Sequence, residues 1–105
     1  MIGRIWHGYT TPENADVYFN VLKTEVLPGI AKMKIPGYRS IQVLRRRLDN
    51  EVEFITVMWF DSLEDVKSFT GNDYEVAHVP ARAREVLKRF DERSQHYELI
   101  EELHY

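Results

Sequence analysis

Cysteine is absent from the 105 residues of this sequence. Its absence excludes a disulfide framework, a thiolate metal site and a cysteine nucleophile. No apolar run approaches the ~18 residues that a membrane span requires, and the N-terminus lacks the basic region and apolar core of a signal peptide. We therefore expect a cytoplasmic protein without a membrane partner.

Positive charge is not in excess, because 14 basic residues stand against 17 acidic ones and the formal net charge is −3. A protein that binds a phosphate backbone carries a basic surface, so we expect no nucleic-acid partner. The run Arg45–Arg47 is no basic patch, since strand alternation sends Arg46 to one face and its neighbours to the other. No spacing of His, Asp or Glu is typical of a metal site, and we expect no metal.

Length and composition indicate a single folded domain over residues 1–105. The chain is 44% hydrophobic and 30% charged, which is typical of globular proteins. At this length, near the common domain size of ~100–150 residues, there is no room for a second core. The sequence also contains no internal repeat, linker or low-complexity tract.

The first third of the chain predicts a strand followed by an amphipathic helix. Residues 2–10 are aromatic and branched with a period of two, which favours a strand. Thr11 and Pro12 then supply an N-cap hydroxyl and a proline for the first helical position. Pro28 lacks the amide that would bond one turn back, so we place the end of the helix near residue 31. The apolar stripe that follows the N-cap consists of Ala15, Tyr18, Phe19, Leu22 and Val26.

Residues 38–47 and 51–60 predict two strands joined by a tight turn at residues 49–50. The turn sets the register of the hairpin. One face pairs Arg46 with Glu53, Leu44 with Ile55, Gln42 with Val57 and Ser40 with Trp59; the other pairs Arg47 with Val52, Arg45 with Phe54, Val43 with Thr56, Ile41 with Met58 and Arg39 with Phe60. Both faces carry large apolar groups, whereas a sheet with one wet face alternates apolar and polar residues. The hairpin must therefore be covered on both sides.

The rest of the chain predicts two more helices and a last strand. A capping box at residues 61–65 begins a short helix that ends at Gly71. Residues 72–79 are ambiguous, Pro80 begins a helical stretch whose apolar stripe extends to Phe90, and residues 94–100 predict a strand. This order is the split βαβ arrangement of an α+β, ferredoxin-like fold with a four-stranded antiparallel sheet.

A sheet of this kind covers one face with its own helices and leaves the other face bare. The second apolar face therefore needs another protein. A homodimer that packs sheet against sheet is the simplest closed solution, because a two-fold interface uses the same patch twice.

Several short motifs carry a resemblance to a known family. They are RIWHG at residues 4–8, VLRR at 43–46, WFDSLE at 59–64, FTGNDYE at 69–75 and HYE at 96–98. Together they resemble the antibiotic biosynthesis monooxygenase (ABM) domain family over nearly the whole chain. The resemblance implies the dimeric α/β barrel superfamily, in agreement with the strand order. That family includes cofactor-free quinone-forming monooxygenases, haem-degrading enzymes and many members of unknown role.

A cofactor-free monooxygenase must hold the anion of a phenol or enol while its electron-rich carbon reacts with dioxygen away from water. This chemistry needs a dry aromatic pocket with few polar groups. We expect Trp6, Trp59 and Arg82 to bind the substrate and Tyr74 and His78 to be catalytic. In this hypothesis Arg82 pairs with the anion and His78 accepts the phenolic proton. The expected ligand is a small hydrophobic or aromatic molecule, and no cofactor is expected.

Each candidate also has a purely structural interpretation. Trp6 and Trp59 suit core or dimer packing, although Gly8 leaves space on the face of Trp6. The two catalytic candidates lie four residues apart and share a face only if residues 72–79 form a helical turn. Arg82 alternates with alanines on a predicted helix, which is typical of a solvated face.

Two other functions stay open at this point. A non-catalytic homodimer could bind a small hydrophobic ligand or stabilise a neighbouring enzyme, and a filled interior would favour it. Haem degradation is the third option, since the resemblance places His78 near the haem-ligating His of that branch. The first predicted strand contains no Asn, however, and Phe69 or a neighbour stands where that branch has Trp. These departures disfavour haem degradation.

Overall fold

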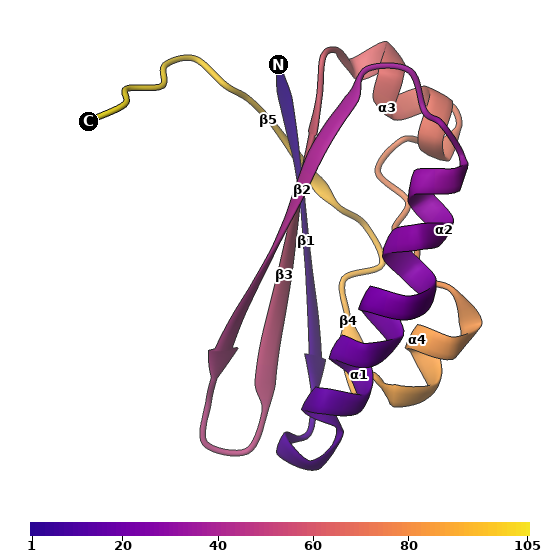
Figure 1. Cartoon of the computed structure of the whole chain (residues 1–105), viewed down its shortest axis with the longest axis vertical. Helices are drawn as coiled ribbons and strands as arrows, with labels where there is room; N and C mark the ends of the chain where they lie inside the picture. The colour runs from indigo at the N-terminus through magenta and orange to yellow at the C-terminus, as the bar shows by residue number, and fades with distance from the viewer.

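Five antiparallel strands form one sheet in the computed structural model, which describes residues Met1 to Tyr105. The strand order is β2-β3-β1-β4, and β5 also pairs with β1. All helices lie on one side of the sheet, and the C-terminal tail leaves on the other (Figure 1). The strands are β1 (Ile2–Thr10), β2 (Tyr38–Arg47), β3 (Val52–Phe60), β4 (Arg89–Phe90) and β5 (Gln95–Glu98).

The first helical run begins one residue after Thr11, whose hydroxyl accepts a hydrogen bond from the Asn14 amide at 3.2 Å, and ends at Lys32, close to the predicted residue 31. It does not break at Pro28, because that proline falls in the first turn of α2, immediately after a π-helical turn. The helical elements are η1 (Pro12–Asn14), α1 (Ala15–Val21), the π-helix η2 (Leu22–Val26), α2 (Leu27–Lys32), α3 (Leu63–Thr70) and α4 (Ala81–Val86). None of them is long and apolar enough to cross a membrane.

The register of the β2–β3 hairpin is as predicted from Arg47–Val52 to Ser40–Trp59. The prediction is wrong only at the far end, where Tyr38 rather than Arg39 pairs with Phe60. Arg39 is the additional residue of a bulge, and its guanidinium binds the Asp61 carboxylate beyond the end of β3 (Nε to Oδ1, 2.8 Å).

The prediction for the last third of the chain is partly wrong. The helix that begins after Pro80 ends at Val86, and Phe90 lies in the short strand β4, where it pairs with Gly8. Contacts with β1 end the helix: the Thr10 hydroxyl donates to the Val86 carbonyl at 2.6 Å, and the Lys88 amide bonds the Tyr9 carbonyl at 2.7 Å. Residues 72–79 form turns and a loop, and the last strand covers only Gln95–Glu98.

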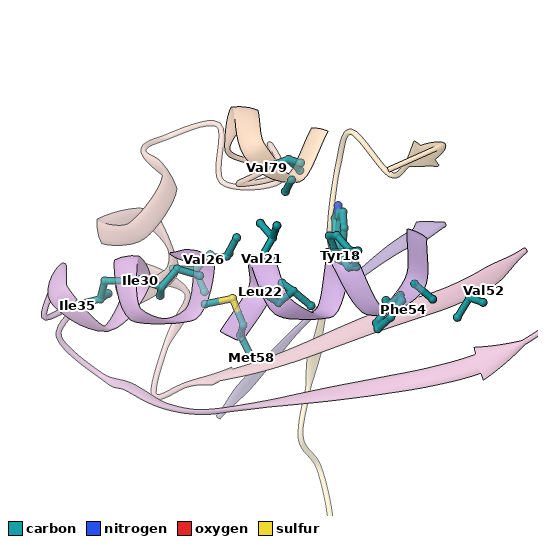
Figure 2. Packing of buried hydrophobic residues seen from close by; sticks show 14 of the residues in the cluster. Tyr18, Val21, Leu22, Val26, Ile30, Ile35, Val52, Phe54, Met58 and Val79 are labelled. Carbon is teal, nitrogen blue, oxygen red and sulfur yellow. The ribbon is translucent and has the colours of Figure 1, made fainter. Parts of the chain in front are cut away.

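The hydrophobic core lies between the sheet and the helices (Figure 2). Side chains of the first helical run meet those of β3, and the rings of Tyr18 and Phe54 pack edge to face with centroids 4.9 Å apart. Burying one such large side chain contributes about 1.5–3 kcal/mol. This packing makes one face of the sheet the covered face.

The opposite, open face of the sheet carries the alternate residues of the same strands. Leu44 is 53% exposed there, and Tyr97 on β5 is 57% exposed. The tail beyond β5 adds Ile100, which is 89% exposed. Both faces of the sheet therefore carry large apolar groups, as predicted, and the sheet is not closed into a barrel within one chain.

Candidate functional site

A pocket opens between the covered face of the sheet and the helices. Its walls are mostly apolar, since 11 of its 16 lining residues are hydrophobic. Leu22, Val26 and Met58 are among them, and Figure 2 shows the sulfur of Met58 pointing from β3 toward the helix. The polar side chains on the pocket wall are Arg4, Thr56, His78 and Ser94, together with Tyr18.

The enclosed free space of the pocket is small. The space not filled by atoms is about 480 Å³ when open solvent is included, whereas the space that the centre of a water-sized molecule can occupy is about 40 Å³. A site of ~10–15 Å³ on this second measure holds one water, so the interior has room for a few. The interior therefore has room for one end of a ligand and not for a whole aromatic molecule.

Trp6 of β1 forms one wall of the pocket, and its orientation is held on both sides. Its indole Nε1 donates to the Asp91 carbonyl at 2.8 Å. Its ring covers Gly8, where an added Cβ would lie 2.3 Å from the nearest ring atom. The space that Gly8 leaves is thus filled by the indole itself, and the indole N–H has its partner. Trp6 offers a ligand an apolar surface.

His78 lies at the mouth of the pocket, in the loop before α4. Its ring packs against Phe69 with centroids 5.2 Å apart, and it makes no hydrogen bond within the chain. Partial burial and, secondarily, the positive charge of Arg4 lower the pKa of His78. The imidazole is therefore neutral at pH 7 and has a nitrogen lone pair available to accept a proton.

Arg4 of β1 is the charged group of the pocket wall, and the sequence analysis missed it as a site residue. The side chain is only 3% exposed, and its guanidinium donates to the carbonyls of Tyr74 and Val76, the latter at 2.7 Å. A third contact, 2.9 Å long, reaches His96 Nε2. Burial lowers the pKa of Arg4 to about 10, so it stays charged at neutral pH. No carboxylate lies within 4.0 Å of it.

Ser94 completes the polar part of the pocket. The residue is 3% exposed, its hydroxyl oxygen is buried, and that oxygen has no hydrogen-bond partner. Buried hydroxyls are normally hydrogen-bonded. Arg4 and Ser94 therefore bring a cation and an unused hydroxyl to one apolar pocket.

Three solved structures share this architecture over nearly their whole length. One, provisionally assigned as an antibiotic biosynthesis monooxygenase from Bacillus cereus, is 14% identical and has a TM-score of 0.70, with 99% of this chain and 97% of that chain covered. The haem degrader MhuD from Mycobacterium tuberculosis, with two haems bound, is 20% identical and has a TM-score of 0.62, with 99% of this chain and 100% of that chain covered. A third structure, from Chloroflexus aurantiacus, has the same provisional assignment as the first. It is 19% identical and has a TM-score of 0.58, with 98% of this chain and 96% of that chain covered.

This chain has the ABM fold. No protein-family model and no curated protein sequence matches it, so the likeness is one of structure. The resemblance inferred from the sequence motifs and the α+β, ferredoxin-like fold class are thereby confirmed.

Within this ABM fold, only two of the five predicted site residues line the pocket, namely Trp6 and His78. Trp59 lies on the open face, where its indole N–H donates to Gln42 Oε1 at 3.0 Å. Tyr74 packs its ring on His96, with centroids 5.2 Å apart, and turns its carbonyl to Arg4. Arg82 is exposed on α4, 3.5 Å from the Glu25 carboxylate.

The open face of the ABM sheet carries a second polar cluster, centred on Glu53. This carboxylate is 5% exposed and accepts from His7 Nδ1 at 2.9 Å, from the Tyr9 hydroxyl at 3.2 Å and from the Arg46 guanidinium at 2.7 Å. The bonds from His7 and Arg46 hold the pKa of Glu53 below its usual value. No group of three or more metal-ligating side chains occurs here or elsewhere in the chain.

Proposed function

We propose that this chain is a cofactor-independent monooxygenase that oxidises a small aromatic or polyketide-like phenol or enol. The observation that carries the proposal is the pocket, in which neutral His78 and charged Arg4 share mostly apolar walls. Both groups flank the Phe69 ring: the His78 ring centroid is 5.2 Å from it and the Arg4 guanidinium carbon 5.5 Å. A phenolic oxygen beside Phe69 is thus within reach of a base and a cation together.

The reaction balances without a cofactor. His78 accepts the phenolic proton, and dioxygen adds to the electron-rich ring carbon of the resulting anion. The protonated imidazole returns its proton to the peroxide oxygen, and the O–O bond breaks as water leaves with that proton and the hydrogen of the attacked carbon. One oxygen atom stays as the new carbonyl, so a phenol and dioxygen give a quinone and water.

In this proposal Trp6 is the stacking wall and His78 the catalytic residue. Tyr74, Arg82 and Trp59 lie outside the pocket, and we assign them no contact with the substrate. The anion-holding role that the sequence analysis gave to Arg82 passes to Arg4, because Arg82 sits on the surface against Glu25.

Oxygen uptake with a dihydroxynaphthalene or an anthrone tests the proposal. His78→Ala should slow uptake by about 100-fold, the lower end of what a positioned general base contributes. His104→Ala, in the exposed C-terminal tail, is the matched control and should leave the rate unchanged. Absence of uptake by the wild-type protein, or an undiminished rate in His78→Ala, would contradict the proposal.

Haem does not fit the pocket. MhuD binds two haems in this fold, but here the space that admits water-sized molecules is about 40 Å³. Sites that enclose a molecule of drug size or larger usually have ~300–1,000 Å³, so this interior takes one end of a small phenol and cannot enclose a porphyrin. Leu22, Val26 and Met58 occupy the interior, and His78 packs on Phe69. We therefore derive no step through haem.

We also propose that the open face joins a second copy of this chain. Leu44 and Tyr97 are more than half exposed on that face, and Trp59 and Tyr97 flank Gly3 of β1 on the same face. A standard interface buries ~1,600 Å² in total, and a two-fold axis brings the same patch to both sides. A cytoplasmic location stays a prediction from the sequence.

A further inference from the structure

We propose that Arg4 and Ser94 form an anion subsite that selects ligands carrying an acidic oxygen on a planar aromatic group: a phenolate, an enolate or a carboxylate. The inference rests on the proposed function and deepens it, because it names what the pocket recognises. Its basis is a buried cation and a buried hydroxyl that the rest of the chain leaves incompletely satisfied.

The charge of Arg4 has no counter-charge in the protein. The side chain is 3% exposed, yet its partners are two carbonyl oxygens and a neutral imidazole nitrogen. Buried charges are normally paired with an opposite charge. The other titratable groups that face it are His78 and His96; burial and, secondarily, the charge of Arg4 lower the pKa of both, so they stay neutral and provide no counter-charge.

Arg4 also has hydrogen-bond donors to spare. A guanidinium carries five N–H donors. The contacts with Tyr74, Val76 and His96 involve Nη1 and Nη2 and use three of them, and Nε makes no bond within the chain. Since Arg4 lines the pocket, the remaining donors suit an oxyanion that arrives there.

Ser94 is the independent second observation. Its Oγ is buried and unpartnered, and the residue lines the same pocket as Arg4. A ligand oxyanion would accept a hydrogen bond from this hydroxyl and from the guanidinium at once. The acidic end group would lie at Arg4 and Ser94, beside the Phe69 ring that His78 also contacts, while the rest of the ligand extends toward the solvent.

Arg4 could alternatively act only as a staple that holds the loop carbonyls of Tyr74 and Val76. A staple has no preference for the charge of a ligand. The discriminating measurement is therefore the affinity for two ligands of the same shape that differ in charge.

Benzoate and benzamide form such a pair, and neither is oxidised by dioxygen under these conditions. Titration calorimetry at pH 7.5 should show benzoate binding to the wild-type protein about tenfold or more tightly than benzamide, as expected for a charge-assisted contact. Arg4→Met should abolish the preference, and Ser94→Ala should reduce it. Arg47→Met is the matched control, since Arg47 is exposed at the hairpin end of β2, and it should keep the full preference.

The experiment stays decisive if Arg4→Met fails to fold, because the wild-type protein and Ser94→Ala carry the comparison alone. The preference for benzoate should also persist when the salt is raised from about 0.15 to 0.5 M, whereas attraction to surface arginines is screened. Equal affinity for the two ligands, no binding of benzoate, or an intact preference in Arg4→Met would overturn the inference.

These experiments distinguish a failure of the anion subsite from a failure of the proposed oxygenase function. If benzoate is preferred and no phenol is oxidised, the anion subsite stands and the oxygenase proposal fails. If phenols are oxidised and benzoate has no advantage, the oxygenase proposal stands and the anion subsite fails.

Discussion

Two charged side chains are buried in this protein, and they lie on opposite faces of the same sheet. Glu53 on the open face is 5% exposed and accepts hydrogen bonds from His7, Tyr9 and Arg46. Arg4 on the covered face is 3% exposed and has only neutral partners. The two side chains are buried to a similar degree, but neighbouring groups compensate the charge of Glu53 and none compensates the charge of Arg4.

The difference separates a structural charge from one that is available for binding. Neighbouring donors hold the pKa of Glu53 down, and the carboxylate is satisfied without any outside group. The pKa of Arg4 is lowered to about 10 by burial, and no carboxylate compensates that cost. A ligand gains little at Glu53 and much at Arg4, which is why we place the functional site on the covered face.

The largest expected effect concerns the open face as an interface. Leu44→Arg would place a charge on the exposed apolar part of β2 on that face and should weaken the dimer by about 100-fold or more. Sedimentation at micromolar concentration measures this as a shift from dimer to monomer. Val17→Arg is the control, because Val17 is 45% exposed on the helical side and should leave the dimer intact. A wild-type monomer would refute the proposed interface.

The next effect tests whether Glu53 is a structural charge. Glu53→Gln keeps the shape but weakens the bonds from His7 and Arg46, and should lower the free energy of unfolding by about 1–2 kcal/mol at pH 7. Chemical denaturation measures the change. Because the folded-state pKa of Glu53 lies below the usual 4.5, the wild-type advantage should be present above pH 4.5 and lost as the pH falls further.

Asp73→Asn is the matched control for Glu53→Gln. Asp73 pairs with Arg93 at 2.6 Å in an exposed position, so its loss should change stability little. An equal effect of the two variants would mean that burial adds nothing to the Glu53 cluster, and the comparison of the two faces would lose its basis.

The smallest effect concerns His96, the neutral partner of Arg4. Burial and the charge of Arg4 lower the pKa of His96 to about 4, so the unfolded chain binds a proton that the folded chain rejects between about pH 6.5 and 4. The free energy of unfolding of the wild-type protein should therefore decrease as the pH is lowered from 6.5 to 4. In His96→Asn the total decrease over this range should be smaller by about 1 kcal/mol, a value reduced because His96 is partly exposed to solvent. His104→Asn should keep the wild-type slope; if His96→Asn keeps it as well, His96 is not held neutral.

Local patterns along the chain determined much of this fold. The turn at residues 49–50 sets the β2–β3 register, and the register holds until the bulge at Arg39. The N-cap at Thr11 and the helical spacing of apolar residues place the first helical run. The apolar residues on both faces of the hairpin predict a sheet whose own helices cover one face and leave the other uncovered. These features depend on residues within a few positions of one another, so their signals are readable without the fold.

Contacts between distant segments decided the rest, including the site. Phe90 continues the apolar helical spacing of the residues before it, but its backbone pairs with Gly8 of β1 and it lies in strand β4 instead. Trp59 turned out to lie on the open face, away from the pocket.

The sequence did contain a signal for Arg4, which shares a strand face with Trp6 and Gly8. That its partners would be carbonyls 70 and 72 residues away, with no carboxylate among them, followed only from the folded chain. Periodicity determines which side chains are buried, whereas the pairing of a buried charge depends on which segments the tertiary structure brings against it.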